Sequence, residues 1–314
     1  MNWAHTMKSN EMLSIEWVRN LYDHHYNPAH PFQEWQNHAL GKLDHLCQLL
    51  LNYKSVLIAY SGGVDSTFLL KVAVEILGKK TTALIAVSDS YPEWEHQQAK
   101  HYAQEMGLAN LIEVQTNEMQ RQGYRANAGD RCYHCKAELF DVAHVFADHH
   151  PDSSDQTLCY GAIMDDLGDH RPGMQAAKER SAHAPLIEAQ LYKKEIRFLS
   201  QLLKLPTWDK PASACLSSRF PYGTEITSER LAQVGRCEAR LMTLGFQVFR
   251  ARYHGDLVRL EFGQKELEDL YRDSTLRHQV SQVCKEVGFK FVSIDLEGYR
   301  SGSANEVLVK IEGL

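Results

Sequence analysis

The stretch that most constrains this chain is residues 55–77, where an apolar run, a glycine turn and a helical pattern follow one another directly. Ser55 to Tyr60 is rich in Val, Ile and Leu, as expected of a strand that is covered on both faces. Val64 to Leu77 carries apolar residues at helical spacing and stops at Gly78, a usual C-terminal cap. The pattern predicts a buried strand, a tight turn and a helix.

The turn has the sequence Ser61-Gly62-Gly63-Val64-Asp65-Ser66, which we call the anion loop. Two glycines let the backbone turn sharply and approach a ligand closely. The helix start presents N–H groups and the positive end of its dipole, so a phosphate is the natural occupant. No Gly-Lys-Ser/Thr follows at the Walker spacing, so this is a different kind of phosphate loop.

As a whole, the anion loop resembles the PP-loop of ATP pyrophosphatases, which hold pyrophosphate there and cleave ATP between the α and β phosphates. The resemblance implies an α/β, adenine nucleotide α-hydrolase-like domain. It also implies ATP with Mg²⁺ as cofactors. The residues implied to bind ATP and its pyrophosphate are Ser61, Gly62, Gly63, Asp65 and Ser66.

Composition describes the broad class of the chain. Its 314 residues suffice for one large domain or two ordinary ones, and 44% hydrophobic and 24% charged residues are typical of a soluble globular protein. The net charge of −6 gives no basic field that argues for nucleic acid. With no apolar run long enough for a membrane span and no apolar signal core, we expect a cytoplasmic protein.

Strand and helix patterns alternate after the anion loop, which predicts a parallel sheet with helices on both faces. Ligands of such sheets bind outside the carboxyl ends of the strands. Ser88, Asp89 and Ser90 follow the second strand there, and they either contact the nucleotide or cap the next helix. In the loop after the strand Thr157–Tyr160, Asp165, Asp166 and Asp169 are either solvated acids or ligands for Mg²⁺.

The predicted domains are an N-terminal extension over residues 1–40, a nucleotide domain over 41–222 and a smaller α+β domain over 223–314. In the last, Phe246–Tyr253 and Leu257–Phe262 predict a hairpin. Its period of two places Arg250 and Arg252 on one face. Lys290–Leu296 and Glu306–Ile311 are expected to close the sheet.

An odd count of seven cysteines without a signal peptide argues against a disulfide framework. Cys132 and Cys135 form one Cys-x-x-Cys, which alone fits a redox pair, half a zinc site, part of an iron–sulfur site or two core thiols. The redox interpretation is disfavoured because such motifs open the first helix of a thioredoxin-like unit, and this one is not expected to do so; the next helix is expected over Ala137–Ala147. His134 lies inside the pair and cannot easily join it as a ligand. The cysteines expected to be buried thiols are Cys47, Cys159, Cys237 and Cys284.

A third cysteine of interest, Cys215, lies in the segment 205–223, whose three prolines rule out a regular helix. A long structured loop with Trp, Cys, Ser and Arg is more often functional than a plain connector. Three thiolates can hold a [4Fe–4S] cluster with one iron left open for a substrate or an extra sulfide.

Five segments in this order resemble the LarE family: SGGVDS, RCYHCK, GAIMDDLGDHRPGMQAA, LPTWDKPASACLSSRFPYGTEIT and HGDLVRLE. The family consists of ATP-dependent sulfur transferases that make the nickel-pincer nucleotide cofactor. They adenylate a carboxylate of pyridinium-3,5-biscarboxylic acid mononucleotide and convert it to a thiocarboxylate. The resemblance covers roughly residues 41–314.

The resemblance also implies residue roles. Cys215 is the sulfur site; in one branch of the family that cysteine is itself the donor, and in another, three cysteines hold a [4Fe–4S] cluster. Having Cys132, Cys135 and Cys215 places this sequence in the second branch, with an external sulfur source. A phosphate- and carboxylate-bearing substrate calls for arginines. The residues expected at the substrate are Ser218, Arg219, Arg250 and Arg252, although each arginine could instead be a solvated surface charge. Glu238 and Glu261 resemble acids near the family's active site, or they are surface or salt-bridged residues.

Two other functions compete with this hypothesis. One is a tRNA thiolation or amidotransfer enzyme with the same loop, which the acidic net charge disfavours. The other is a non-catalytic sulfur carrier or zinc-stabilised protein in which Cys132 and Cys135 are structural. The expected partner is a nicotinate-derived mononucleotide rather than nucleic acid or membrane, and the resemblance suggests a homo-oligomer.

Overall fold

The computed structural model describes residues 14–150, 155–168, 172–211, 214–300 and 302–303. The packing of the chain forms two compact units that interleave along the sequence. The first unit comprises residues 1–87, 95–116 and 136–210, and the second comprises 88–94, 117–135 and 211–314. The domain limits at residues 40 and 222 stay predictions.

The first unit contains a four-stranded, wholly parallel sheet in the order β3-β2-β1-β4, as predicted. Strand β1 is buried along its whole length, which fits its unbroken apolar sequence. Because β1 lies between β2 and β4, its carboxyl end is central in the sheet. The strands are β1 (Val56–Ala59), β2 (Thr81–Val87), β3 (Asn110–Gln115) and β4 (Thr157–Tyr160).

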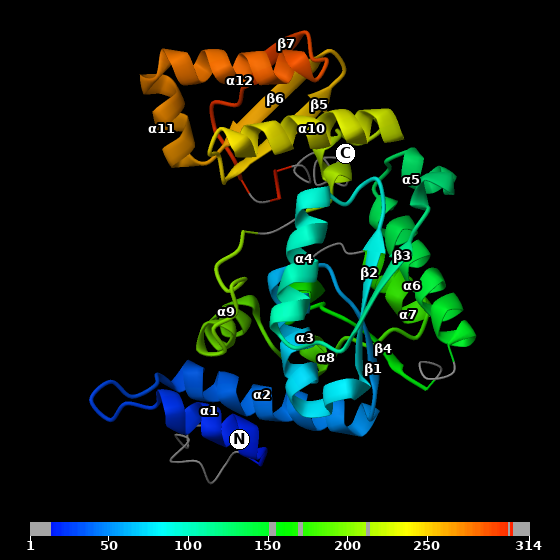
Figure 1. Ribbon diagram of the computed structural model, residues 1–314, viewed down its shortest axis with the longest axis vertical. Coiled ribbons are helices and arrows are strands. Elements are labelled where there is room, and N and C mark those ends of the chain that lie inside the picture. The colour runs from blue at the N-terminus through cyan, green and yellow to red at the C-terminus, as the bar shows by residue number, and fades with distance from the viewer. Residues whose placement is uncertain (1–13, 151–154, 169–171, 212–213, 301, 304–314) are drawn as a thin grey trace. The chain divides into compact units, whose positions relative to one another are not determined.

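Helices flank this sheet (Figure 1). Helix α3 follows β1 with the predicted bounds, Val64–Leu77, and ends at Gly78, whose φ is 56°. Helices α2, α3 and α9 pack on one another. The other helices with residues in this unit are α1 (Glu16–His25), α2 (Glu34–Tyr53), α4 (Glu93–Glu105), α6 (Arg131–His149), α7 (Pro172–Glu179), α8 (Pro185–Glu188) and α9 (Lys193–Leu202).

The second unit contains a small mixed sheet in the order β5-β6-β7. Strands β5 (Phe249–His254) and β6 (Leu257–Phe262) form the predicted antiparallel hairpin, and β7 (Phe291–Ile294) pairs in parallel with β6. The strand predicted over Glu306–Ile311 lies outside the described residues. Among the described residues, the α-helices that lie wholly within this unit are α5 (Gln122–Arg125), α10 (Ser228–Thr243), α11 (Gln264–Arg272) and α12 (Ser274–Glu286), and the first five residues of α6 also belong to it.

One prediction about the Cys-x-x-Cys is wrong. The helix expected over Ala137–Ala147 begins six residues earlier, at Arg131, so Cys132 and Cys135 lie within the first five residues of α6. The sequence RCYHCK contains no Gly or Pro, and the helix therefore extends back to the residue that follows Gly129-Asp130. The motif does open a helix, but α6 is preceded along the chain by α1 to α5, so it is not the first helix of a thioredoxin-like unit.

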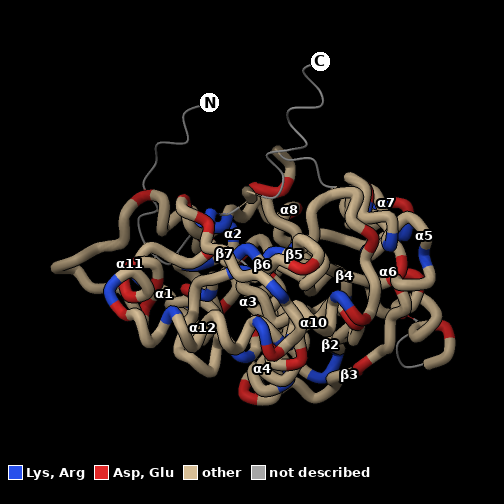
Figure 2. The backbone as a smooth tube through the Cα atoms, turned by 90° about the horizontal axis from the view of Figure 1, so that it is seen from above, with Lys and Arg blue, Asp and Glu red and all other residues tan. Residues whose placement is uncertain are grey.

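Basic and acidic residues are interspersed along the labelled elements in Figure 2. Many of them form ion pairs within their own unit, such as Lys193 with Asp65 in the first and Arg219 with Glu238 in the second. Across the described residues, no helix has both the length and the apolar character that a membrane crossing requires.

Candidate functional site

The anion loop takes a conformation that its glycines permit. Gly62 has a φ of +64°, and a Cβ there would come within 2.6 Å of the Ala99 Cβ on α4. Gly63 is the N-cap of α3, so the next backbone N–H groups belong to a helix start. The backbone geometry fits the predicted anion site.

Ser61 and Ser66, at the two ends of the anion loop, are joined through their hydroxyl groups. The Oγ atoms of Ser61 and Ser66 lie 3.1 Å apart, and the Ser61 N–H donates to the Ser66 Oγ at 3.3 Å. Gly161, the first residue after β4, approaches so closely that a Cβ there would lie 2.9 Å from the Ser66 nitrogen. The end of β4 is therefore part of the wall that shapes the loop. The sequence did not single out Gly161.

Asp65 of the anion loop is paired with a lysine that sequence reasoning missed. The Nζ of Lys193, the first residue of α9, lies 2.7 and 2.6 Å from the two carboxylate oxygens of Asp65. Burial raises the pKa of Asp65, with a further rise from the charge of Asp166, and Lys193 opposes the shift. The two partners are 128 residues apart in the sequence, so no local pattern could have joined them.

The acidic loop after β4 forms a short 3₁₀ turn, Met164–Gly168. Asp165 accepts a hydrogen bond from the Lys193 N–H at 2.8 Å, and Asp166 accepts one from the Ile163 N–H at 3.0 Å. Asp165 thus lies beside Lys193, which contacts the anion loop, and the charge of Asp166 acts on Asp65. Asp169 is outside the described residues.

The fit of these acids to Mg²⁺ follows from its ligand habits. Within the described residues, no group of three or more His, Cys, Asp or Glu side chains could hold a metal ion. Mg²⁺ commonly takes only one or two carboxylates and completes its shell with phosphate oxygens and water. Asp165 and Asp166 are compatible with that habit, and their role as ligands stays a prediction.

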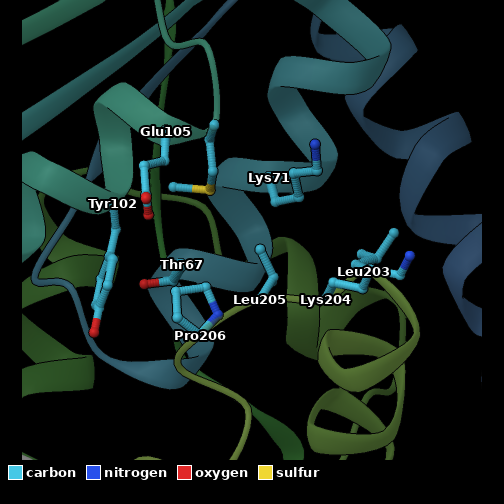
Figure 3. A pocket seen from close by; sticks show the side chains of 9 residues that line it. Thr67, Lys71, Tyr102, Glu105, Leu203, Lys204, Leu205 and Pro206 are labelled. Atoms are coloured by element: carbon cyan, nitrogen blue, oxygen red, sulfur yellow. The ribbon is translucent and has the colours of Figure 1, made fainter.

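A pocket of about 150 Å³ in the first unit lies beside the anion loop's helix rather than at the loop (Figure 3). Thr67 and Lys71 of α3 line it together with Tyr102 of α4 and the segment 203–206. None of the predicted site residues lines this pocket. The candidate nucleotide site therefore rests on the anion loop itself.

The second unit contains all three cysteines of interest. Cys132 is exposed, and Cys135 and Cys215 are half-buried. Cys215 directly precedes a 3₁₀ turn, Leu216–Arg219. We call Arg131–Cys135 and Cys215–Arg219 together the cysteine region. In the described part of the chain the three thiols do not form a group that could hold a metal ion.

Arg131 is a buried cation within the cysteine region. Its Nη1 donates to the Asn127 Oδ1 at 2.6 Å and to the Ser217 carbonyl at 2.8 Å. Burial acts to lower the pKa of this guanidinium, but electrostatic interactions with Cys215, Cys132 and two tyrosines act in the opposite direction, and the pKa is raised overall. Arg131 is thus an electrostatic partner of both thiols, and sequence reasoning missed it.

Asn127 forms hydrogen bonds both with Arg131, the first residue of α6, and with the segment that follows Cys215. It is fully buried, has a φ of 52°, and donates through Nδ2 to the carbonyls of Pro221 at 2.8 Å and Thr224 at 3.1 Å. Tyr124 adds a hydroxyl hydrogen bond to the Ser217 Oγ. Burial, with a smaller contribution from Cys215, raises the Tyr124 pKa.

Arg219 and Glu238, both predicted site residues, form a buried bidentate ion pair. Nε and Nη2 of Arg219 lie 2.9 and 2.8 Å from the two carboxylate oxygens. Nη1 of Arg219 donates to the Ala214 carbonyl at 2.6 Å and to the Ser218 Oγ at 2.9 Å. The guanidinium therefore holds the backbone next to Cys215. A role in binding substrate stays a prediction.

The other predicted arginines lie nearby in the same unit. Arg252 pairs with Glu261 at 2.7 Å and donates to the Ser218 carbonyl at 2.8 Å. Arg250 donates to the Phe249 carbonyl at 2.6 Å and lies over the Tyr299 ring. Its pKa is lowered by burial and by the charge of Arg219. Two arginines whose charges act on each other, Arg219 and Arg250, are compatible with an anionic substrate group.

Three smaller predictions concern residues around these regions. Ser90 donates to Glu118 at 2.9 Å within the second unit, and a nucleotide contact by Ser88–Ser90 stays a prediction. His134 is paired with Asp130, and its ring occupies the space that a Cβ on Gly123 would take. The four cysteines predicted to be buried are buried: Cys47, Cys159, Cys237 and Cys284.

Comparison with known proteins gives the family. A family model described as NAD synthase matches residues 48–132, which include the anion loop and end at the first cysteine of the Cys-x-x-Cys. The pyridinium-3,5-bisthiocarboxylic acid mononucleotide synthase of Lactiplantibacillus plantarum is 34% identical over 268 residues, which are 85% of this chain and 95% of that synthase. The chain belongs to the LarE family.

Two further relatives have names that assign no activity. An uncharacterized protein of Synechocystis is 46% identical over 275 residues, 86% of this chain and 99% of that protein. An uncharacterized protein of Methanocaldococcus jannaschii is 28% identical over 248 residues, 79% of this chain and 92% of that protein. The similarity of this LarE family chain to its relatives therefore extends over residues of both units.

Proposed function

We propose that this protein is an ATP-dependent sulfur transferase that converts a carboxylate of pyridinium-3,5-biscarboxylic acid mononucleotide to a thiocarboxylate. The observation that carries the proposal is the family membership, because the relative from Lactiplantibacillus plantarum bears the name of a synthase of the corresponding bisthiocarboxylic acid. The anion loop at the start of α3 supports ATP use, since a helix start with glycines before it favours phosphate.

The first step activates the carboxylate. A carboxylate oxygen attacks the α-phosphorus of ATP, the bond to the bridging oxygen breaks, and pyrophosphate leaves. The acyl adenylate then has AMP as a leaving group, which replaces the unfavourable loss of oxide. In this proposal the N–H groups at the start of α3 and the hydroxyls of Ser61 and Ser66 bind the departing pyrophosphate.

The second step transfers sulfur. A sulfide ion from the external donor, held next to Cys215, attacks the acyl carbon, the carbon–oxygen bond breaks, AMP leaves, and the thiocarboxylate remains as the product. Arg131 interacts electrostatically with Cys215 and Cys132, and its hydrogen bond to the Ser217 carbonyl holds the chain just after Cys215. Arg219 and Arg252 hold the carbonyls of Ala214 and Ser218 on either side of Cys215 and so fix the position of its backbone.

The sulfur source proposed for this chain is a [4Fe–4S] cluster held by Cys132, Cys135 and Cys215 and supplied by an external sulfide donor. The donor set fits in chemistry, since thiolates are the ligands of such clusters, and all three residues belong to the second unit. The described thiols nevertheless do not form a metal-binding group, so we derive no step through the cluster.

Homo-oligomerisation stays a prediction.

The decisive experiment compares Cys215→Ala with Cys284→Ala, a buried thiol of α12 outside the cysteine region. With ATP, Mg²⁺, sulfide and the dicarboxylate, wild type and Cys284→Ala should release pyrophosphate and form thiocarboxylate, measured by mass spectrometry. Cys215→Ala should still release pyrophosphate but form no thiocarboxylate. Thiocarboxylate made by Cys215→Ala refutes the role of this residue, and absence of pyrophosphate release by wild type refutes the proposed reaction.

The cluster has a separate test. Protein purified and reconstituted without oxygen should contain about three to four irons per chain with matching sulfide. Cys132→Ala should lose most of this iron, whereas Cys47→Ala should keep it. Iron-free protein after reconstitution contradicts the cluster, and bound zinc in its place would favour a structural role for the Cys-x-x-Cys.

A further inference from the structure

The anion loop contains no cationic side chain of its own. Its six residues, Ser61 to Ser66, include one carboxylate, Asp65, and neither Lys nor Arg. A bound triphosphate adds several negative charges next to that carboxylate. Helix-end N–H groups offset part of this charge, but close cationic side chains contribute more at short range. A cationic side chain that offsets this charge therefore has to come from another segment of the chain.

Lys193 supplies a cationic side chain to the anion loop. Its ammonium contacts both carboxylate oxygens of Asp65, at 2.7 and 2.6 Å. Its backbone is anchored separately, because its N–H donates to Asp165 at 2.8 Å. The Lys193 side chain is 37% exposed and the Asp65 side chain 23%, so the pair faces space that a ligand can enter. A fixed backbone and an accessible ammonium suit a group that exchanges one anion for another.

We propose that Lys193 is a phosphate-binding residue of the nucleotide site, whose ammonium moves from Asp65 to the β- and γ-phosphate oxygens when ATP binds. The inference rests on the proposed function only in that ATP binds at the anion loop. The exchange is local, because rotation of a lysine side chain suffices while the backbone of α9 stays in place. Asp65 then becomes available to the divalent cation that accompanies the nucleotide.

Other cations near the loop are bound differently. Lys210 donates to the Gly62 carbonyl at 3.2 Å, so it supports the loop backbone. Arg197 of α9 donates to the carbonyls of Trp208 and Lys210 at 2.7 and 2.8 Å. Lys194, next to Lys193 in the sequence, lies over the Trp35 ring at 4.0 Å. Among these four, Lys193 is the one whose described partner is a carboxylate of the loop.

The geometry also accounts for Asp65. Its side chain is 23% exposed, and both of its carboxylate oxygens contact the ammonium of Lys193. Phosphate oxygens that carry more charge are stronger partners for the same ammonium.

The test measures nucleotide affinity of the full chain by calorimetry for ATP, pyrophosphate and AMP, each with Mg²⁺. Lys193→Gln should weaken ATP and pyrophosphate binding at least about tenfold, as expected for a lost charge-assisted hydrogen bond. AMP binding should change less than about twofold, because AMP lacks the β and γ phosphates. Lys194→Gln is the matched control and should bind all three ligands as wild type does.

Lys193→Arg retains the charge and should recover much of the ATP affinity, which guards against a simple folding defect. The inference is overturned if Lys193→Gln binds ATP as wild type does, or if it loses ATP and AMP affinity equally. The proposed function fails differently, since wild type itself would then bind no ATP or would bind ATP without releasing pyrophosphate on addition of the dicarboxylate.

Discussion

The anion loop and the cysteine region are built by different means. The loop uses six consecutive residues, whose backbone is set by Gly62 and by the close approach of Gly161 to Ser66. The cysteine region uses side chains from separate segments, with Arg131 bonded to the Ser217 carbonyl and Arg219 bonded to Glu238. The conformation of the anion loop depends on glycines that have no Cβ atom. The cysteine region is held instead by hydrogen bonds from charged side chains.

The largest expected effect concerns the buried ion pair of the second unit. Arg219→Met should lower the free energy of unfolding by about 3–5 kcal/mol, because Glu238 would remain buried without its partner. Arg240, on the same helix as Glu238, pairs with Glu286 at the surface, and Arg240→Met should cost about 1 kcal/mol or less.

Chemical denaturation, followed by hydrogen exchange within α10, measures both variants. If Arg219→Met and Arg240→Met lower the free energy of unfolding equally, the second unit does not depend on its buried charges. The proposed difference between the cysteine region and the anion loop would then be wrong.

The next effect concerns the backbone of the first unit. Gly161→Ala should cost about 1–3 kcal/mol, because its Cβ would lie 2.9 Å from the Ser66 nitrogen and the loop would have to shift. ATP affinity should fall with it. Gly168→Ala is the control, since nothing lies within 4 Å of a Cβ there. If Gly161→Ala binds ATP as wild type does, the wall formed by β4 is not needed for the loop.

The smallest expected effect is a pH dependence of stability that comes from His254, a histidine on which two arginines of the hairpin act. Burial, together with Arg259 and Arg252, lowers the pKa of His254 at the end of β5. The folded state therefore binds fewer protons at this histidine than the unfolded chain does. Its stability contribution is complete above the unfolded pKa of about 6.5 and is lost as pH falls through the lower folded value.

His254→Gln should remove this part of the acid destabilisation while leaving stability above neutral pH nearly unchanged. Unfolding midpoints measured from pH 8 down to about pH 5 give the slope. An unchanged slope in the variant would show that the arginines of the hairpin do not act on this end of β5.

The same difference explains what the sequence could predict. The bounds of α3, the parallel sheet and the hairpin follow from local periodicity, and the anion loop is a contiguous motif. The helix that starts at Arg131 was missed although Asp130, directly before it, is a usual N-cap residue, because a single Asp is equally common in loops. Pairings such as Lys193 with Asp65 depend on tertiary packing, and no periodicity encodes them.

Candidate residues could be chosen in the second unit, but their arrangement could not. Arg219 and Glu238 were each expected near the site, yet nothing in the sequence indicated that they bind one another. A charged side chain looks the same in sequence whether it contacts a substrate or a buried partner, because the difference lies in what the fold places around it.

Asn127 sets a limit on how the cysteine region can diverge. Glycine would keep its left-handed backbone at a φ of 52°, but would lose the amide that binds Pro221, Thr224 and Arg131. Aspartate would keep the shape and the bond to Arg131, but has no N–H for the two carbonyls. Few other side chains tolerate this backbone. Sequence change can therefore accumulate around this residue far more readily than at it.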